Sequence, residues 1–197
     1  METTTEILAL GAVASAIAAA IILVRVHLLP GGHAWPPPPL GEINDGPYHA
    51  YHRALVLLLG LSAALMVVAL DRGTEAEALG LAFLGVHAGA RLAGAFDVSE
   101  RVGLVVTAVA ITALAFGAAD ITNAIEGSPG WSEGTGSALR GAADAIGVTA
   151  VLTLAASIVP IARERSYGLV ERMLCVAAIA WLLIASVHLA TLAGGSL

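Results

Sequence analysis

The chain has 197 residues, of which 58% are hydrophobic and only 12% are charged, and its formal net charge is −6. Soluble domains contain about 45–50% apolar and about 25% charged residues, and a small soluble fold still exposes much of its surface. The composition therefore excludes a soluble or disordered chain, and the acidic balance excludes a basic nucleic-acid-binding surface. All nine basic residues are arginines, so no lysine is present to carry a Schiff base.

Six hydrophobic runs are each close to the about 20 residues that a helix needs to cross a bilayer. They are residues 7–29, 53–70, 78–96, 102–122, 142–162 and 169–193. We therefore predict an all-α fold: one domain, residues 1–197, that is a polytopic integral membrane protein with a bundle of six transmembrane helices. The first run is longer than a signal-peptide core and no basic segment precedes it, so we expect a retained helix.

Two of the predicted connections are long. Residues 30–52 contain four consecutive prolines, 36–39, which favour a stiff extended segment, and residues 123–141 are rich in glycine and serine. The other connections are short, so consecutive helices should be antiparallel neighbours. Pro160 should kink or end the fifth span.

The arginines predict an orientation. Seven of the nine lie in or beside the connections after the first, third and fifth spans: Arg25, Arg53, Arg91, Arg101, Arg163, Arg165 and Arg172. Arg72 and Arg140 belong to the opposite side. Because cytoplasmic loops carry the excess of basic residues, we expect these connections in the cytoplasm and both termini outside the cell membrane.

Polar side chains within the spans are candidates for function, because polarity is expensive in a bilayer. His87 and Arg91 are four residues apart in the third span and share a helix face. They could line a polar path for protons or ions. The alternative, which we favour, is a structural His87 that hydrogen-bonds a neighbouring helix, with Arg91 reaching toward the headgroups.

Gly85 and Gly89 lie on the opposite face of the same span and form a small-xxx-small pair. Such pairs let helix backbones approach closely. We therefore predict that the third span is central in the bundle and packs a neighbour at these glycines.

Histidines suggest two possible cofactor sites. His188, in the last span, could join His87 as a second haem ligand, although their expected depths differ by roughly 6 Å. Near the first connection, His27, His49 and His52 could bind Zn or Cu, since His49 and His52 have i, i+3 spacing. The alternative is an interfacial belt of histidine and aromatic side chains, and we predict no resident cofactor.

Asp120 lies at the end of the fourth span, where it can reach water, and Arg140 is expected to pair with Asp144 four residues later. The sequence contains no hydrolase, metalloprotease or nucleotide-binding motif. We assign no catalytic residue and expect a non-enzymatic protein.

Short motifs are similar to those of a known family. They are Gly46-Pro47-Tyr48 before the second span, Gly94-Ala95-Phe96-Asp97 at the end of the third, and Tyr167-Gly168-Leu169-Val170-Glu171-Arg172 at the start of the last. In these motifs the chain resembles the DUF998 family of small six-helix membrane proteins, which are loosely grouped with Frag1/DRAM-type proteins. The resemblance implies the six-helix fold and carries no settled activity.

The sequence alone allows three possible functions. The first is a non-enzymatic accessory or scaffold subunit of a membrane complex, or a homo-oligomer, with the lipid bilayer and other subunits as partners. The second is a small transporter or channel with a polar path at His87 and Arg91. The third is a metal- or haem-bearing redox subunit.

Overall fold

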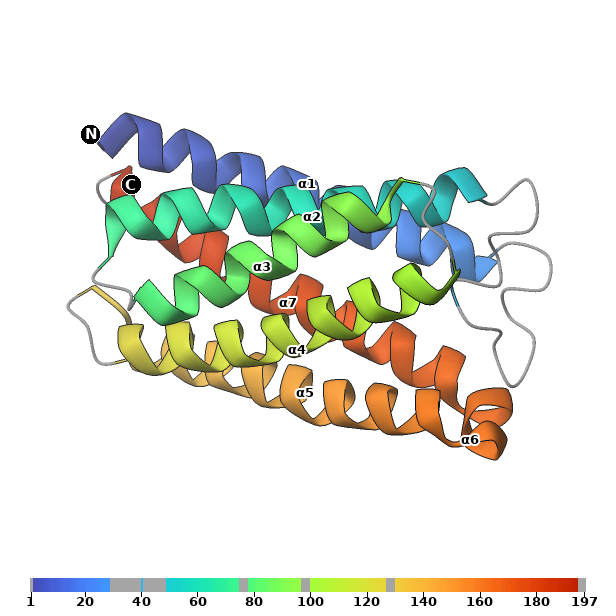
Figure 1. The fold of residues 1–197 in the computed structure, drawn as a ribbon. Helices are drawn as coiled ribbons and strands as arrows, with labels where there is room; N and C mark the ends of the chain where they lie inside the picture. Colours follow the sequence, from blue (N-terminus) through green and yellow to red (C-terminus); the bar gives the residue numbers. More distant parts are fainter. Residues whose placement is uncertain are drawn as a thin grey trace.

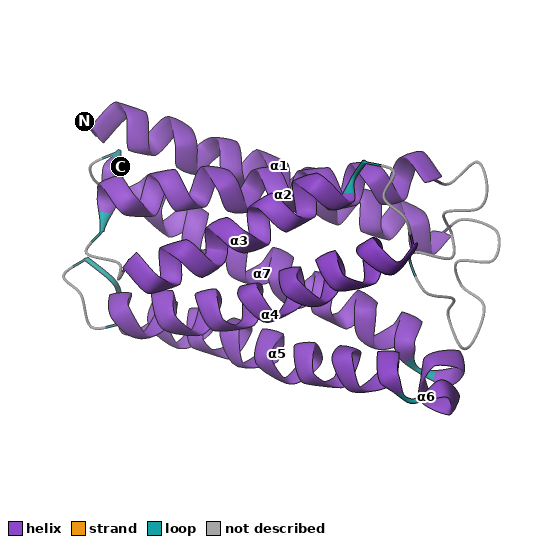
Figure 2. Cartoon of the chain, in the orientation of Figure 1, coloured by secondary structure: helices purple, strands orange, loops and turns teal. Residues whose placement is uncertain are grey.

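The computed structural model describes residues 2–28, 40, 49–74, 78–96, 100–126 and 130–194, which form helices joined by turns with no strand among them (Figures 1 and 2). The helices are α1 (Glu2–Leu28), α2 (His49–Gly73), α3 (Ala78–Gly94), α4 (Glu100–Ile125), α5 (Glu133–Ile158), α6 (Pro160–Arg165) and α7 (Tyr167–Ala193). The all-α prediction is confirmed.

Five helices, α1, α2, α4, α5 and α7, are long and apolar enough to cross a membrane, and α3 is a shorter apolar helix of 17 residues. Many of their large hydrophobic side chains face outward, among them Ile21, Val105 and Val151. Outward apolar side chains on every long helix would be costly in water and are what a bilayer requires. The chain is therefore a helical membrane protein whose long helices contact the lipid bilayer.

The helices form a closed bundle. Each of α1 to α5 packs against the next in sequence, α5 packs against α7, and α7 returns to α1. Both termini lie at one end of the bundle, on the left in Figure 1. We call the opposite end, where α1 ends and α7 begins, the arginine-rich end, because seven of the nine arginines belong to it.

The core is centred on α7, which contacts α1, α2 and α5 and has the largest buried share of any span. Trp181, fully buried in the middle of α7, donates its indole N–H to the Thr122 hydroxyl of α4 at 3.0 Å. By contrast, α3 packs mainly against α2 and α4. The prediction that the third span is central was therefore wrong.

Helix boundaries differ from the predicted spans mainly in the second half. Helix α4 continues to Ile125 and α5 already begins at Glu133, so much of the loop predicted for 123–141 is helical. Ser132 caps α5, since its side chain accepts from the Thr135 N–H. The prediction for Pro160 is confirmed: α5 ends at Ile158, and Pro160 opens the short helix α6.

Candidate functional site

His87 is buried between α3 and α4, with 1% of its surface exposed. Its Nδ1 lies 2.7 Å from the backbone oxygen of Ala110 on α4. Because a carbonyl oxygen only accepts, Nδ1 must carry the proton. Nε2 is also buried and has no hydrogen-bond partner within the described part of the chain. His87 thus links two helices, as the structural alternative expects.

A close contact between α3 and α4 involves two glycines that face each other. A Cβ on Gly117 would lie 3.0 Å from the backbone nitrogen of Leu84 and 3.3 Å from the backbone oxygen of Gly80. A Cβ on Gly80 would lie 2.7 Å from Asp120 Oδ2. Asp120 is therefore packed against the first turn of α3, and its buried Oδ2 has no hydrogen-bond partner among the described residues.

Gly85 and Gly89 were predicted to mark such a contact, and that prediction was wrong. A Cβ at either position would have nothing within 4 Å. They lie on an outward stripe of small residues on α3, opposite the buried face of Gly80, Leu84 and His87. The physical reason is that His87 and Leu84 occupy the inward face, and the two glycines, about half a turn away, must then face outward.

A small pocket with polar lining lies toward the arginine-rich end, between α2, α3, α4 and α7. Its ionisable or thiol side chains are those of His52, Arg91, Glu171 and Cys175. Its free volume of ≈ 10 Å³ is about that needed for one water molecule. The remaining lining side chains are Leu40, Leu55, Val56, Leu59, Thr107, Ile111 and Leu174.

Arg91 is held in this pocket by packing. A Cβ added at Gly60 of α2 would lie 3.0 Å from the Cβ of Arg91. The absence of a side chain at Gly60 therefore makes room for the arginine side chain. The Arg91 Nε is buried and has no hydrogen-bond partner among the residues described. The half-buried Arg91 therefore lines this pocket near the arginine-rich end.

Glu171 and Leu40 meet at the same pocket. The Leu40 backbone N–H donates to Glu171 Oε2 at 2.6 Å, and the Leu40 side chain is 3% exposed and joins the hydrophobic core. Beside them, Arg172 donates from Nη1 to the Gly168 oxygen at 2.9 Å within α7. Leu40, which lies between α1 and α2 in the sequence, thus packs against the bundle.

At the termini end, polar side chains join α4, α5 and α7. His188 Nε2 lies 3.0 Å from the Gly130 oxygen, and its ring packs on Trp131 with centroids 4.1 Å apart. His87 and His188 are therefore engaged with different partners. Arg140 forms an ion pair with Glu126 and donates to Asn123. The predicted pair of Arg140 with Asp144 was wrong, because the end of α4 comes within reach.

Among the residues that the structure describes, the histidines predicted to bind Zn or Cu do not form a cluster. His27 is exposed on the last turn of α1, and His52 lines the pocket on α2. The side chain of His49 and all of His33 lie outside the described residues. Within the described ranges, no group of three or more His, Cys, Asp or Glu side chains is placed to hold a metal ion.

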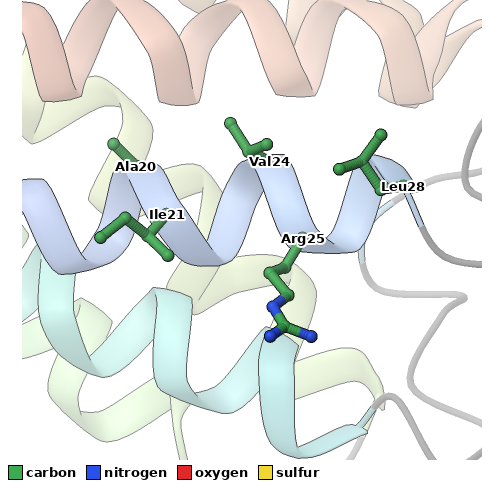
Figure 3. Close-up of a pocket in the computed structure, with 5 residues that line it drawn as sticks. All are labelled: Ala20, Ile21, Val24, Arg25 and Leu28. Atoms are coloured by element: carbon green, nitrogen blue, oxygen red, sulfur yellow. The ribbon is translucent and has the colours of Figure 1, made fainter.

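A larger, open groove runs along the end of α1 (Figure 3). It has a volume of ≈ 560 Å³ and is lined by Ala20, Ile21, Val24, Arg25 and Leu28. Apart from Arg25, which points to a different side from Val24 in Figure 3, these side chains are apolar. The groove lies on the outer surface of α1, and its described lining carries no constellation of reactive groups.

Sequence reasoning missed the role of Gly60, Gly117 and the Leu40–Glu171 contact. The contact joins residues 131 positions apart, and no local pattern marks it. Glu171 and Arg172 did stand out as part of the Gly-Leu-x-Glu-Arg motif.

Compared with known proteins, the sequence matches no protein-family model and has no significant match among curated proteins or solved structures.

Proposed function

We propose that the protein is a non-enzymatic membrane subunit that assembles with a second copy of itself through the outer face of α3. The observation that carries this proposal is the open stripe of Gly85 and Gly89. Glycines on an outward face leave the helix backbone accessible, and two such faces can approach closely. Ala82 and Ala93 extend the same stripe and are also exposed.

The length of α3 also supports the proposal that its outer face is the assembly surface. At 1.5 Å per residue its 17 residues span about 26 Å, which is less than the about 30 Å hydrocarbon thickness of a typical bilayer. Association is one of the ways in which a short span relieves this mismatch. Because both copies insert with the same orientation, a two-fold axis along the membrane normal would place the two α3 helices side by side and parallel.

The test counts subunits in detergent and in nanodiscs by native mass spectrometry. We expect a dimer or larger assembly for the natural sequence and a shift to monomer for Gly89→Leu and Gly85→Leu. Gly147→Leu is the matched control, because a Cβ at Gly147 of α5 also has nothing within 4 Å. A natural protein that is monomeric in both media, or three variants that behave alike, would reject the assignment to α3.

A second candidate function is a small transporter or channel, and the pocket at Arg91 favours it. A guanidinium with a buried Nε is costly in a bilayer-embedded bundle, and such residues commonly mark a polar path. Gradient dissipation by reconstituted vesicles measures this directly. Transport that Arg91→Gln abolishes would support it, and transport that is absent or unchanged by Arg91→Gln would reject it.

A further inference from the structure

The pocket at Arg91 is enclosed by four helices, but one part of its wall is not helical. Leu40 is that part, and it is separated from α1 and α2 along the chain. The other lining residues come from α2, α3, α4 and α7. Among the described lining residues, Leu40 is therefore the one that could move without a rearrangement of the helices.

We propose that Leu40 is the seal of this polar pocket and that Glu171 holds the seal in place. Removal of the Leu40 side chain opens the pocket to water at the arginine-rich end. The inference does not depend on self-association through α3, since α3 faces the pocket with Arg91 and presents its small-residue stripe on the opposite side.

Two contacts fix Leu40 in this position. Its side chain is 3% exposed and packs in the core cluster, so its burial excludes water from that part of the pocket. Its backbone N–H reaches Glu171 Oε2 at 2.6 Å. A hydrogen bond to a carboxylate is stronger than one between neutral groups, and this one orients the residue that carries the sealing side chain.

The pocket contains groups that water would solvate. Arg91 and Glu171 carry charge, and His52 and Thr107 add polar atoms. With Leu40 in place, the free volume is about that of one water molecule. Truncation of Leu40 to alanine would enlarge this space beside charged groups, so the enlarged space would fill with water.

A cysteine already present in the chain can report whether water reaches the pocket. Cys175 is its one cysteine, it is 5% exposed, and it lines the same pocket. A small, charged, water-soluble methanethiosulfonate reagent reacts with a thiol only where water reaches it. The rate of Cys175 modification in purified protein therefore measures access to the pocket, and Cys175→Ser gives the background.

We expect slow modification of the natural protein and at least a tenfold faster reaction in Leu40→Ala. Leu139→Ala is the matched control, because Leu139 is fully buried on α5 and does not line the pocket. Its modification rate should stay near that of the natural protein. Glu171→Gln, which weakens the bond to the Leu40 N–H, should give an intermediate rate.

Equal rates for Leu40→Ala and the natural protein would overturn the proposal. Equal acceleration in Leu40→Ala and Leu139→Ala would also overturn it, since general loosening would then explain the exposure. If Leu40→Ala does not fold, Leu40→Val provides the same comparison with less volume removed. A Leu40→Val protein with an unchanged modification rate would count against the seal.

Discussion

The glycine pair between α3 and α4 gives the sharpest test of the packing. In Gly117→Ala, the new Cβ would lie 3.0 Å from the Leu84 nitrogen and 3.3 Å from both the Gly80 oxygen and Phe83 Cβ. These atoms belong to the backbone or its first side-chain carbon and cannot rotate away. The two helices would have to move apart by a few tenths of an ångström, and overpacking of this kind costs about 1–3 kcal/mol.

The same substitution also has a favourable effect. Alanine is better than glycine in a helix by about 1 kcal/mol, so the net loss for Gly117→Ala alone is about 0–2 kcal/mol. Gly147→Ala separates the two contributions, because it gains the same helix propensity with nothing within 4 Å of its Cβ. The difference between the two variants should therefore be the packing cost of about 1–3 kcal/mol.

Thermal unfolding in detergent measures this difference. A change of 1 kcal/mol shifts the Tm of a chain of this size by about 2–4 °C, so Gly117→Ala should unfold roughly 2–12 °C below Gly147→Ala. Equal Tm values for the two variants would show that α3 and α4 are not in contact at Gly117, and the glycine contact described above would be wrong.

Three further predictions follow from the described contacts. His87→Gln should keep nearly the natural Tm because an amide can still donate to the Ala110 oxygen, whereas His87→Leu should lose about 0.5–1.5 kcal/mol in the same unfolding assay; equal Tm values would mean that the bond contributes nothing. Trp181→Phe should destabilise by about 1–3 kcal/mol by leaving the buried Thr122 hydroxyl without its donor, while Thr122→Ser should be close to neutral in chemical unfolding because it keeps the acceptor. For topology, a cysteine at the exposed Ser132 in a Cys175→Ser background should react with an impermeant reagent in intact cells; protection of this position would reverse the proposed orientation.

Much of the fold could be predicted from composition and hydrophobic runs, because a bilayer permits few backbone arrangements. The all-α class, the antiparallel order of neighbouring helices and the break at Pro160 follow from these local signals. The rotation of α3 about its own axis could not be predicted from these local signals. Its inward face carries His87 and Leu84 and its outward face Gly85 and Gly89, and both faces show small residues at helical spacing. Only contact with α4 at Gly117 distinguishes them.

The candidate site shows the same division. Arg91 could be selected from the sequence, because a charged residue within an apolar run is conspicuous. The residues that surround it could not be identified from the sequence. Gly60, Leu40 and Cys175 come from three different segments, and each resembles an ordinary apolar or small residue in its own neighbourhood. Tertiary packing alone brings them to the guanidinium.

The most direct measurement of the self-association proposal is disulfide cross-linking in native membranes. In a Cys175→Ser background, Gly89→Cys places a thiol on the outward stripe of α3, close to the expected two-fold axis. Mild oxidation should give a cross-linked dimer of Gly89→Cys and little or none of Gly147→Cys, the equivalent open position on α5. If Gly147→Cys cross-links and Gly89→Cys does not, or if neither forms a dimer, the face of α3 is not the assembly surface.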